Sequence, residues 1–218
     1  LYSCTYGCTI WPSLFCTLKN TSFHLFLEFK NNGFYVDVGA HHPKRFSNTY
    51  LFYRKGWHGI NIDAMPGSMA SFNKMRPRDI NIEVGIAEAE GMLDYHVFNE
   101  PALNGFSSEL STQRDAADST YRVEQVIKVR VQPLHQLFAQ HVNGRPIDFM
   151  SVDVEGLDLE VLKSNDWNMY RPEYVLAEVL GSSISNLTQH PIAQLMTQNG
   201  YEIYAKQVNT VFFKNTKT

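Results

Sequence analysis

The stretch from Phe34 to His41, Phe-Tyr-Val-Asp-Val-Gly-Ala-His, constrains the fold more than any other part of the chain. Its apolar and β-branched residues predict a short strand, and Gly39 predicts a tight turn after it. Asp37 lies at the strand end, where its carboxylate would face the crevice above a parallel sheet. A second predicted strand, 59–62, ends in another acid, Asp63. In nucleotide-binding sheets the glycine lets backbone approach the ligand, and the second acid binds two ribose hydroxyls.

The number of glycines in this turn separates two classes of cofactor. A dinucleotide fingerprint needs three glycines, whereas this turn has only Gly39 and continues into His42 and Pro43. The missing pyrophosphate glycines favour a cofactor without a diphosphate, and S-adenosylmethionine fits that description. Two alternatives stay open from the residues alone: a nucleotide-cofactor oxidoreductase and a non-catalytic cofactor-binding module.

Strand and helix patterns alternate along the chain from residue 34 onward, which predicts an α/β fold with a doubly wound, mainly parallel sheet. A helix is expected from Ser47, as its N-cap, to Gly56, and the polar stretch 111–119 is expected to be a surface excursion. Acids follow several strands, at the sheet edge where ligands bind. The predicted strands are 34–38, 59–62, 80–84, 93–98, 126–131, 147–152, 174–179, 201–205 and 211–214, and the other helices are 66–76, 133–141, 157–163 and 191–199.

Composition limits the partners and the compartment. The net charge of −3 gives no general field to attract nucleic acid or an anionic membrane, so we expect neither. The three cysteines, Cys4, Cys8 and Cys16, make neither a disulfide framework nor a zinc site, and the cysteine-free body suits a reducing, cytoplasmic location. Residues 1–30 are expected to be a leader or packing segment, too polar and too interrupted to span a membrane. Residues 31–218 are expected to form a single domain.

Four blocks of sequence together resemble one family. They are Phe34 to His41, Arg45-Phe-Ser-Asn-Thr49, Leu51 to Asp63 and Ile147 to Gly156, and they resemble the FkbM-type S-adenosylmethionine-dependent methyltransferases over roughly residues 33 to 214. The resemblance implies a class I methyltransferase (Rossmann-like) fold, with a seven-stranded, mainly parallel sheet and an antiparallel closing strand. It also implies O-methylation of a small-molecule hydroxyl, and we expect the acceptor to be a sugar or a secondary metabolite.

The resemblance also implies which residues hold the cofactor. The turn after the first strand would lie under the methionine part, Asp63 would bind the ribose, and the segment after the third strand would line the adenine. His41 and His42 depart from the family, which more often has a small polar pair there. The implied cofactor-binding residues are Asp37, Gly39, Ala40, His41, Ser47, Asn48, Thr49, Asp63, Ala64, Glu83, Val84, Gly85, Ile86 and Asp153.

Three residues are candidates for catalysis. Asp153 and Glu178 end two predicted strands that are otherwise apolar, and a carboxylate buried without partners is costly, which favours a function. Either could take the proton of an acceptor hydroxyl, with His41 behind them. Some class I O-methyltransferases hold Mg²⁺ at the ends of the same two strands. Two carboxylates are an incomplete metal site, so we favour a metal-free base over Mg²⁺ held by Asp153 and Glu178, which stays open as the alternative.

Overall fold

A computed structural model describes residues 30–117 and 120–217. The segment predicted as a leader or packing segment, apart from Lys30, lies outside the described residues, and so do all three cysteines. No helix in the described part of the chain is long and apolar enough to cross a membrane.

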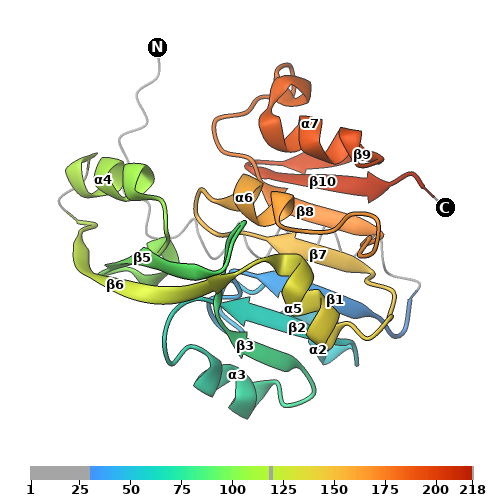
Figure 1. Cartoon of the computed structure of the whole chain (residues 1–218), viewed down its shortest axis with the longest axis horizontal. Helices are drawn as coiled ribbons and strands as arrows, with labels where there is room; N and C mark the ends of the chain where they lie inside the picture. The colour runs from blue at the N-terminus through green and yellow to red at the C-terminus, as the bar shows by residue number, and fades with distance from the viewer. Residues whose placement is uncertain (1–29, 118–119, 218) are drawn as a thin grey trace.

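The main sheet has seven strands in the order β3-β2-β1-β7-β8-β10-β9 (Figure 1). The first five in that order run parallel, and β10 pairs antiparallel with β8. This confirms the predicted sheet and its antiparallel closing strand. The strands are β1 (Phe34–Val38), β2 (His58–Asp63), β3 (Ile80–Glu83), β7 (Phe149–Val152), β8 (Tyr174–Glu178), β9 (Tyr201–Gln207) and β10 (Thr210–Asn215).

Helices cover both faces of the main sheet because its strands are apolar on both sides. In β1, Val36 joins one buried cluster and Tyr35 joins the other. The first cluster includes residues of α5 (Leu134–His141), α6 (Asp158–Lys163) and α7 (Pro191–Gln198), and the second includes residues of α2 (Tyr50–Arg54). Two short elements complete this layer arrangement: α3 (Met69–Met75) and η2 (Leu187–Gln189).

A second, three-stranded sheet lies between β3 and β7 in the sequence and has the order β4-β6-β5. We call it the accessory sheet; it is the green and yellow-green ribbon beside the main sheet (Figure 1). The sequence predicts two of its strands but not their separation from the main sheet. Its elements are β4 (Gly85–Ile86), β5 (Gly91–Phe98), η1 (Pro101–Leu103), α4 (Ser108–Ala117) and β6 (Val123–Gln132).

Two local predictions need correction. The stretch expected to be a surface excursion is, as far as Ala117, the second part of helix α4. Its side chains are mostly exposed, so the apolar stripe that identifies a helix in sequence is missing. Ser47 is not the N-cap of α2, because the helix begins at Tyr50 with Thr49 in the N-cap position. The hydroxyl of Ser47 instead accepts a hydrogen bond from the Tyr50 backbone N–H at 3.1 Å.

The side chain of Arg76 is fully buried between β1 and the loop that precedes α2. Its Nε donates to Asp79 at 2.9 Å, and its Nη2 donates to the hydroxyls of Tyr35 and Thr49, each at 2.7 Å. Nη1 donates to the Ser47 hydroxyl at 3.1 Å. We call these five residues the Arg76 cluster. Every contact is directional, so the cluster fixes the loop under the carboxyl end of β1.

Candidate active site

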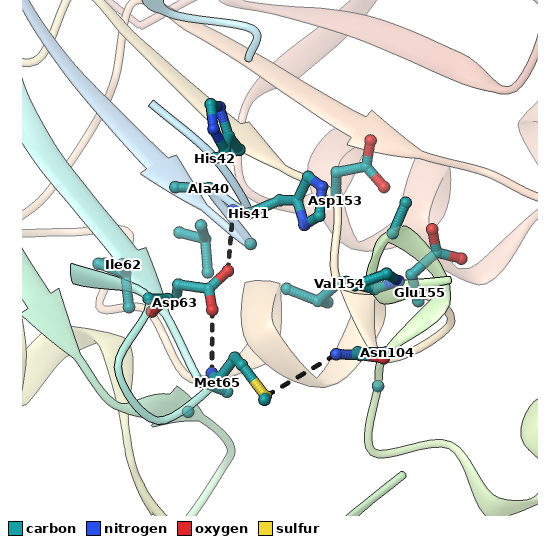
Figure 2. Close-up of a pocket in the computed structure, with 18 of the residues that line it drawn as sticks. Ala40, His41, His42, Ile62, Asp63, Met65, Asn104, Asp153, Val154 and Glu155 are labelled. Carbon is teal, nitrogen blue, oxygen red and sulfur yellow. Dashed lines mark hydrogen bonds between the residues drawn. The ribbon is translucent and has the colours of Figure 1, made fainter. Parts of the chain in front are cut away.

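A cleft of about 1000 Å³ opens at the carboxyl ends of the parallel strands. Loops after β1, β2, β3 and β7 line one side of it, and the accessory sheet with η1 lines the other. Figure 2 shows residues on both sides of this space, with Asp63 and Met65 on one side and Val154 and Asn104 on the other. The cleft therefore lies at the edge where the sequence predicts a ligand.

Gly39 lies in the turn after β1, on one side of the cleft. It has a φ of +80°, which favours glycine, and a Cβ at this position would collide with the carbonyl oxygen of Asp153. The backbone N–H groups of Gly39 and Ala40 both donate to the carbonyl of Ile62 at 3.0 Å. The turn after β1 is thus held against the ends of both β2 and β7.

Asp63 is held in position by the backbone. One carboxylate oxygen accepts from the His41 N–H at 2.8 Å, and the other accepts from the Met65 N–H at 2.9 Å (Figure 2). Burial raises the pKa of Asp63, and these two backbone donors act in the opposite direction. Each carboxylate oxygen keeps a further lone pair, so this group can also accept the two hydroxyls of a ribose.

Asp37 is a buried acid beneath the same turn. The Thr49 hydroxyl donates to it at 2.7 Å, and desolvation raises the pKa of Asp37 to about 6. Because the pKa of this carboxyl is higher in the folded state, its protonation stabilises the folded protein. That contribution is complete at a pH below the ordinary pKa of 3.8 and is lost as the pH rises through about 6. The folded protein therefore carries an unfavourable buried charge above this pH.

Asp37→Asn should remove this pH dependence. The shift from 3.8 to about 6 corresponds to about 3 kcal/mol. Urea unfolding at pH 3 and pH 8 should therefore show that the variant gains about 3 kcal/mol relative to the wild type over this interval. Equal pH dependence in the two proteins would mean that Asp37 does not titrate between these pH values in the folded state.

Three residues that line the cleft have the left-handed backbone conformation although they are not glycine: His41, Phe46 and Glu155, with φ of 54°, 58° and 54°. Such positions cost free energy and gather at ligand sites. The His41 ring stacks on the Phe46 ring, with centroids 6.2 Å apart. Burial lowers the pKa of His41, so its imidazole is neutral near neutral pH and can accept a proton.

Two ion pairs join the loops around the mouth of the cleft. Arg45 lies over the Phe46 ring and reaches Glu100 of the η1 turn at 3.5 Å. Arg114 of α4 pairs with Glu155 at 2.5 Å, and it also donates to the Leu103 carbonyl. These contacts connect the accessory sheet insertion to the loops after β1 and β7.

The structure places most of the predicted site residues in the lining of the cleft. Four lie outside that lining. Ser47 and Thr49 belong to the Arg76 cluster, and Glu83 accepts the Gly67 N–H at 2.8 Å from outside the cleft. Glu178 ends β8, where its backbone N–H donates to Asp158. The predicted residues in the lining are Asp37, Gly39, Ala40, His41, Asn48, Asp63, Ala64, Val84, Gly85, Ile86 and Asp153.

The sequence does not single out several other lining residues. Tyr95 of β5 and Asn104 after η1 are both buried and both line the cleft. Asn104 precedes Gly105, and an Asn-Gly pair is ordinarily interpreted as a turn. The sequence therefore gives no reason to assign the Asn104 side chain to a binding site. No signal in a single sequence would have connected these two residues, because their proximity depends on the accessory sheet.

The model of the methyltransferase FkbM domain matches residues 37–203 of this chain. The chain belongs to the FkbM methyltransferase family. It is an S-adenosylmethionine-dependent methyltransferase with a Rossmann-like fold, as the resemblance implies. The oxidoreductase alternative is thereby excluded. No curated protein matches the chain.

Solved structures resemble the chain only distantly. One is the 1,6-didemethyltoxoflavin-N1-methyltransferase of Burkholderia thailandensis, with 10% identity, a TM-score of 0.48 and coverage of 94% of this chain and 80% of that one. Another is an O-methyltransferase from Bacillus cereus, with 9% identity, a TM-score of 0.41 and coverage of 97% and 82%. Similarities of this size bear on neither the acceptor nor the atom that is methylated.

The cleft fits S-adenosylmethionine. Gly39 lets the turn pack against the backbone of Asp153 at the end of β7, and Asp63 offers a fixed acceptor for the ribose. Among the described lining residues there are five acids, and Arg45 is the single Lys or Arg. This excess of negative charge suits a cationic cofactor. The acids are Asp37, Asp63, Glu100, Asp153 and Glu155. Within residues 30–117 and 120–217, no group of three or more His, Cys, Asp or Glu could hold a metal ion.

Proposed function

We propose that this enzyme methylates a hydroxyl oxygen of a neutral small molecule, such as a sugar or a secondary metabolite. The observation that carries the proposal is Asp153, an acid that follows β7 and lines the cleft, with its backbone carbonyl against the Gly39 turn. A hydroxyl is a weak nucleophile until it loses its proton, so O-methylation needs a base beside the methyl group. A carboxylate at this position supplies one.

When bound, the cofactor supplies an electrophilic methyl group on a sulfonium. Asp63 would hold the ribose, the turn at Gly39 and Ala40 would seat the amino-acid part, and Val84 to Ile86 would line the adenine. The chain then has to align the acceptor oxygen with the methyl carbon. Asp153 would take the hydroxyl proton.

His41 is the second candidate for the base because its neutral ring lines the same cleft. Glu178 ends the neighbouring strand but is not among the lining residues, so we assign it no proton transfer. The order of assignment is therefore Asp153 first and His41 second.

The charge of the lining supports a neutral acceptor. The described lining residues include five acids and, as the single Lys or Arg, Arg45. This excess of negative charge would repel an acceptor that carries a phosphate or carboxylate group. Incubation with S-adenosylmethionine and a panel of hydroxyl compounds, followed by mass spectrometry, tests this expectation. We expect a gain of one CH₂ on neutral polyols or neutral phenols and none on their phosphate esters. Tight cofactor binding without any methylated product would support a non-catalytic binding module instead.

A metal-free reaction is expected. Asp153 lines the cleft whereas Glu178 does not, so the two carboxylates do not offer a joint site for Mg²⁺. Activity in excess chelator should equal the activity without it. Loss of activity in chelator and its recovery with Mg²⁺ would instead make Asp153 a metal ligand.

A further inference from the structure

The orientation of the Asn104 carboxamide is fixed by the backbone. Asn104 is 8% exposed, and its Oδ1 accepts the Phe98 N–H at 2.8 Å. A flipped amide would place two N–H groups against each other, so only one orientation is possible. Nδ2 must therefore face the cleft, where it lies 3.8 Å from the Met65 sulfur (Figure 2).

The Oδ1 atom of this amide has a strong hydrogen-bond partner, whereas its Nδ2 atom has a weak one. A thioether is a weak hydrogen-bond acceptor, and among the described residues Met65 is the only partner of Asn104 Nδ2. Buried donors are ordinarily paired with oxygen or nitrogen, and a donor left without such a partner destabilises the protein. A ligand atom that accepts a hydrogen bond would complete this group.

The backbone around Asn104 is also held in place. Gly105 and His96 exchange two backbone hydrogen bonds, of 2.9 and 3.2 Å, which attach the loop after η1 to β5. The side chain therefore projects from a fixed position, as a binding group requires.

The position of Asn104 indicates which part of the cofactor it would meet. A ligand that starts over Gly39 and places its ribose on Asp63 must continue past the carboxylate oxygen that accepts the Met65 N–H. Figure 2 shows His41 on one side of Asp63, and Met65 with Asn104 on the other. The nucleobase would lie on the Met65 side.

The walls around this position suit a flat ring. Phe106 packs against Tyr95 with ring centroids 4.8 Å apart. The Phe106 ring also lies against Gly85, where a side chain would collide with it. All three residues line the cleft. An apolar pocket with one directed donor is the usual form of a site that selects a heterocycle.

We propose that Asn104 determines recognition of the cofactor's nucleobase, by donating a hydrogen bond from Nδ2 to a ring nitrogen of adenine. Met65 would lie beside the ring. The inference rests on the proposed use of this cleft for S-adenosylmethionine, but not on the identity of the acceptor.

Asn104→Asp gives the sharpest test, because the carboxylate can still accept the Phe98 N–H while the donor is lost. Isothermal titration with S-adenosylhomocysteine should show a Kd raised by about tenfold or more. Asn99→Asp is the matched control. Asn99 also accepts a backbone N–H, from Arg122, but it lies outside the lining of the cleft. Its Kd should stay within about twofold of the wild type.

Deaza analogues test the same contact without depending on a variant. The 1-deaza, 3-deaza and 7-deaza forms of S-adenosylhomocysteine each lack one ring nitrogen. The wild type should bind one of them about tenfold more weakly than the parent compound, and Asn104→Asp should lose that discrimination.

Equal Kd values for Asn104→Asp and Asn99→Asp would overturn the proposal, and so would equal affinity of the wild type for all three analogues. The methyltransferase function would stand in both cases. A wild type that does not bind S-adenosylhomocysteine at all would overturn the proposed function together with this inference, so the two failures are distinguishable.

Discussion

Asp63→Ala is expected to weaken binding of S-adenosylhomocysteine by about 1.5 to 3 kcal/mol, because hydrogen bonds to a charged acceptor fall in that range. This corresponds to a Kd raised by about 10- to 150-fold in isothermal titration. The loss has two sources. The ribose hydroxyls lose their acceptor, and the N–H groups of His41 and Met65 lose the carboxylate that holds both loops.

A control separates binding from folding. Asp94→Ala removes an exposed acid of the accessory sheet that pairs with Lys128 and lies outside the cleft lining. It should leave the Kd unchanged. If Asp63→Ala keeps both its melting temperature and its affinity, the ribose is bound by another group, and the assignment of Asp63 fails.

Asp153→Asn is expected to lower kcat by about 10²- to 10⁴-fold, the range that one positioned base contributes. The substitution keeps the size of the side chain and removes its capacity to take a proton. The remaining rate should depend steeply on the acceptor, since a more acidic hydroxyl needs the base less. A phenolic acceptor should therefore recover more activity than an aliphatic alcohol.

Glu178→Gln provides the comparison for this experiment. Glu178 ends the next strand but does not line the cleft, so its loss should change kcat far less than the loss of Asp153. Single-turnover rates, measured with the enzyme saturated with cofactor, compare the chemical step of the two variants directly. A larger loss in Glu178→Gln would reverse the two roles and place the base at the end of β8.

Most of the main sheet could be predicted from local patterns. Alternating apolar residues identify β1, and the acids at Asp37 and Asp63 indicate the edge where the cleft opens, because parallel strands end at a common edge. The antiparallel closing pair follows from two short alternating runs at the end of the chain and from the family resemblance. These features are local or depend on the order of elements, and both are visible in a sequence.

Contacts between distant segments could not be predicted. Ser47 and Thr49 match a family block, but whether they face a ligand or a buried guanidinium depends on Arg76, which lies far along the chain. Helix α4 escaped prediction because it has no apolar stripe. In the sequence Asn104 looks like an ordinary turn residue, because the contact that orients its amide is made by the backbone N–H of Phe98 and depends on the fold.

The Arg76 cluster also bears on how this family can diverge. A lysine could not reach Asp79, Tyr35 and Thr49 at once, so the loop beneath the cofactor should accept few substitutions, as core positions do. The accessory sheet carries the opposite wall on a separate insertion that does not interrupt the main sheet. Relatives that act on different acceptors are therefore expected to differ in the length and sequence of that insertion, and to vary little in the loop over Arg76.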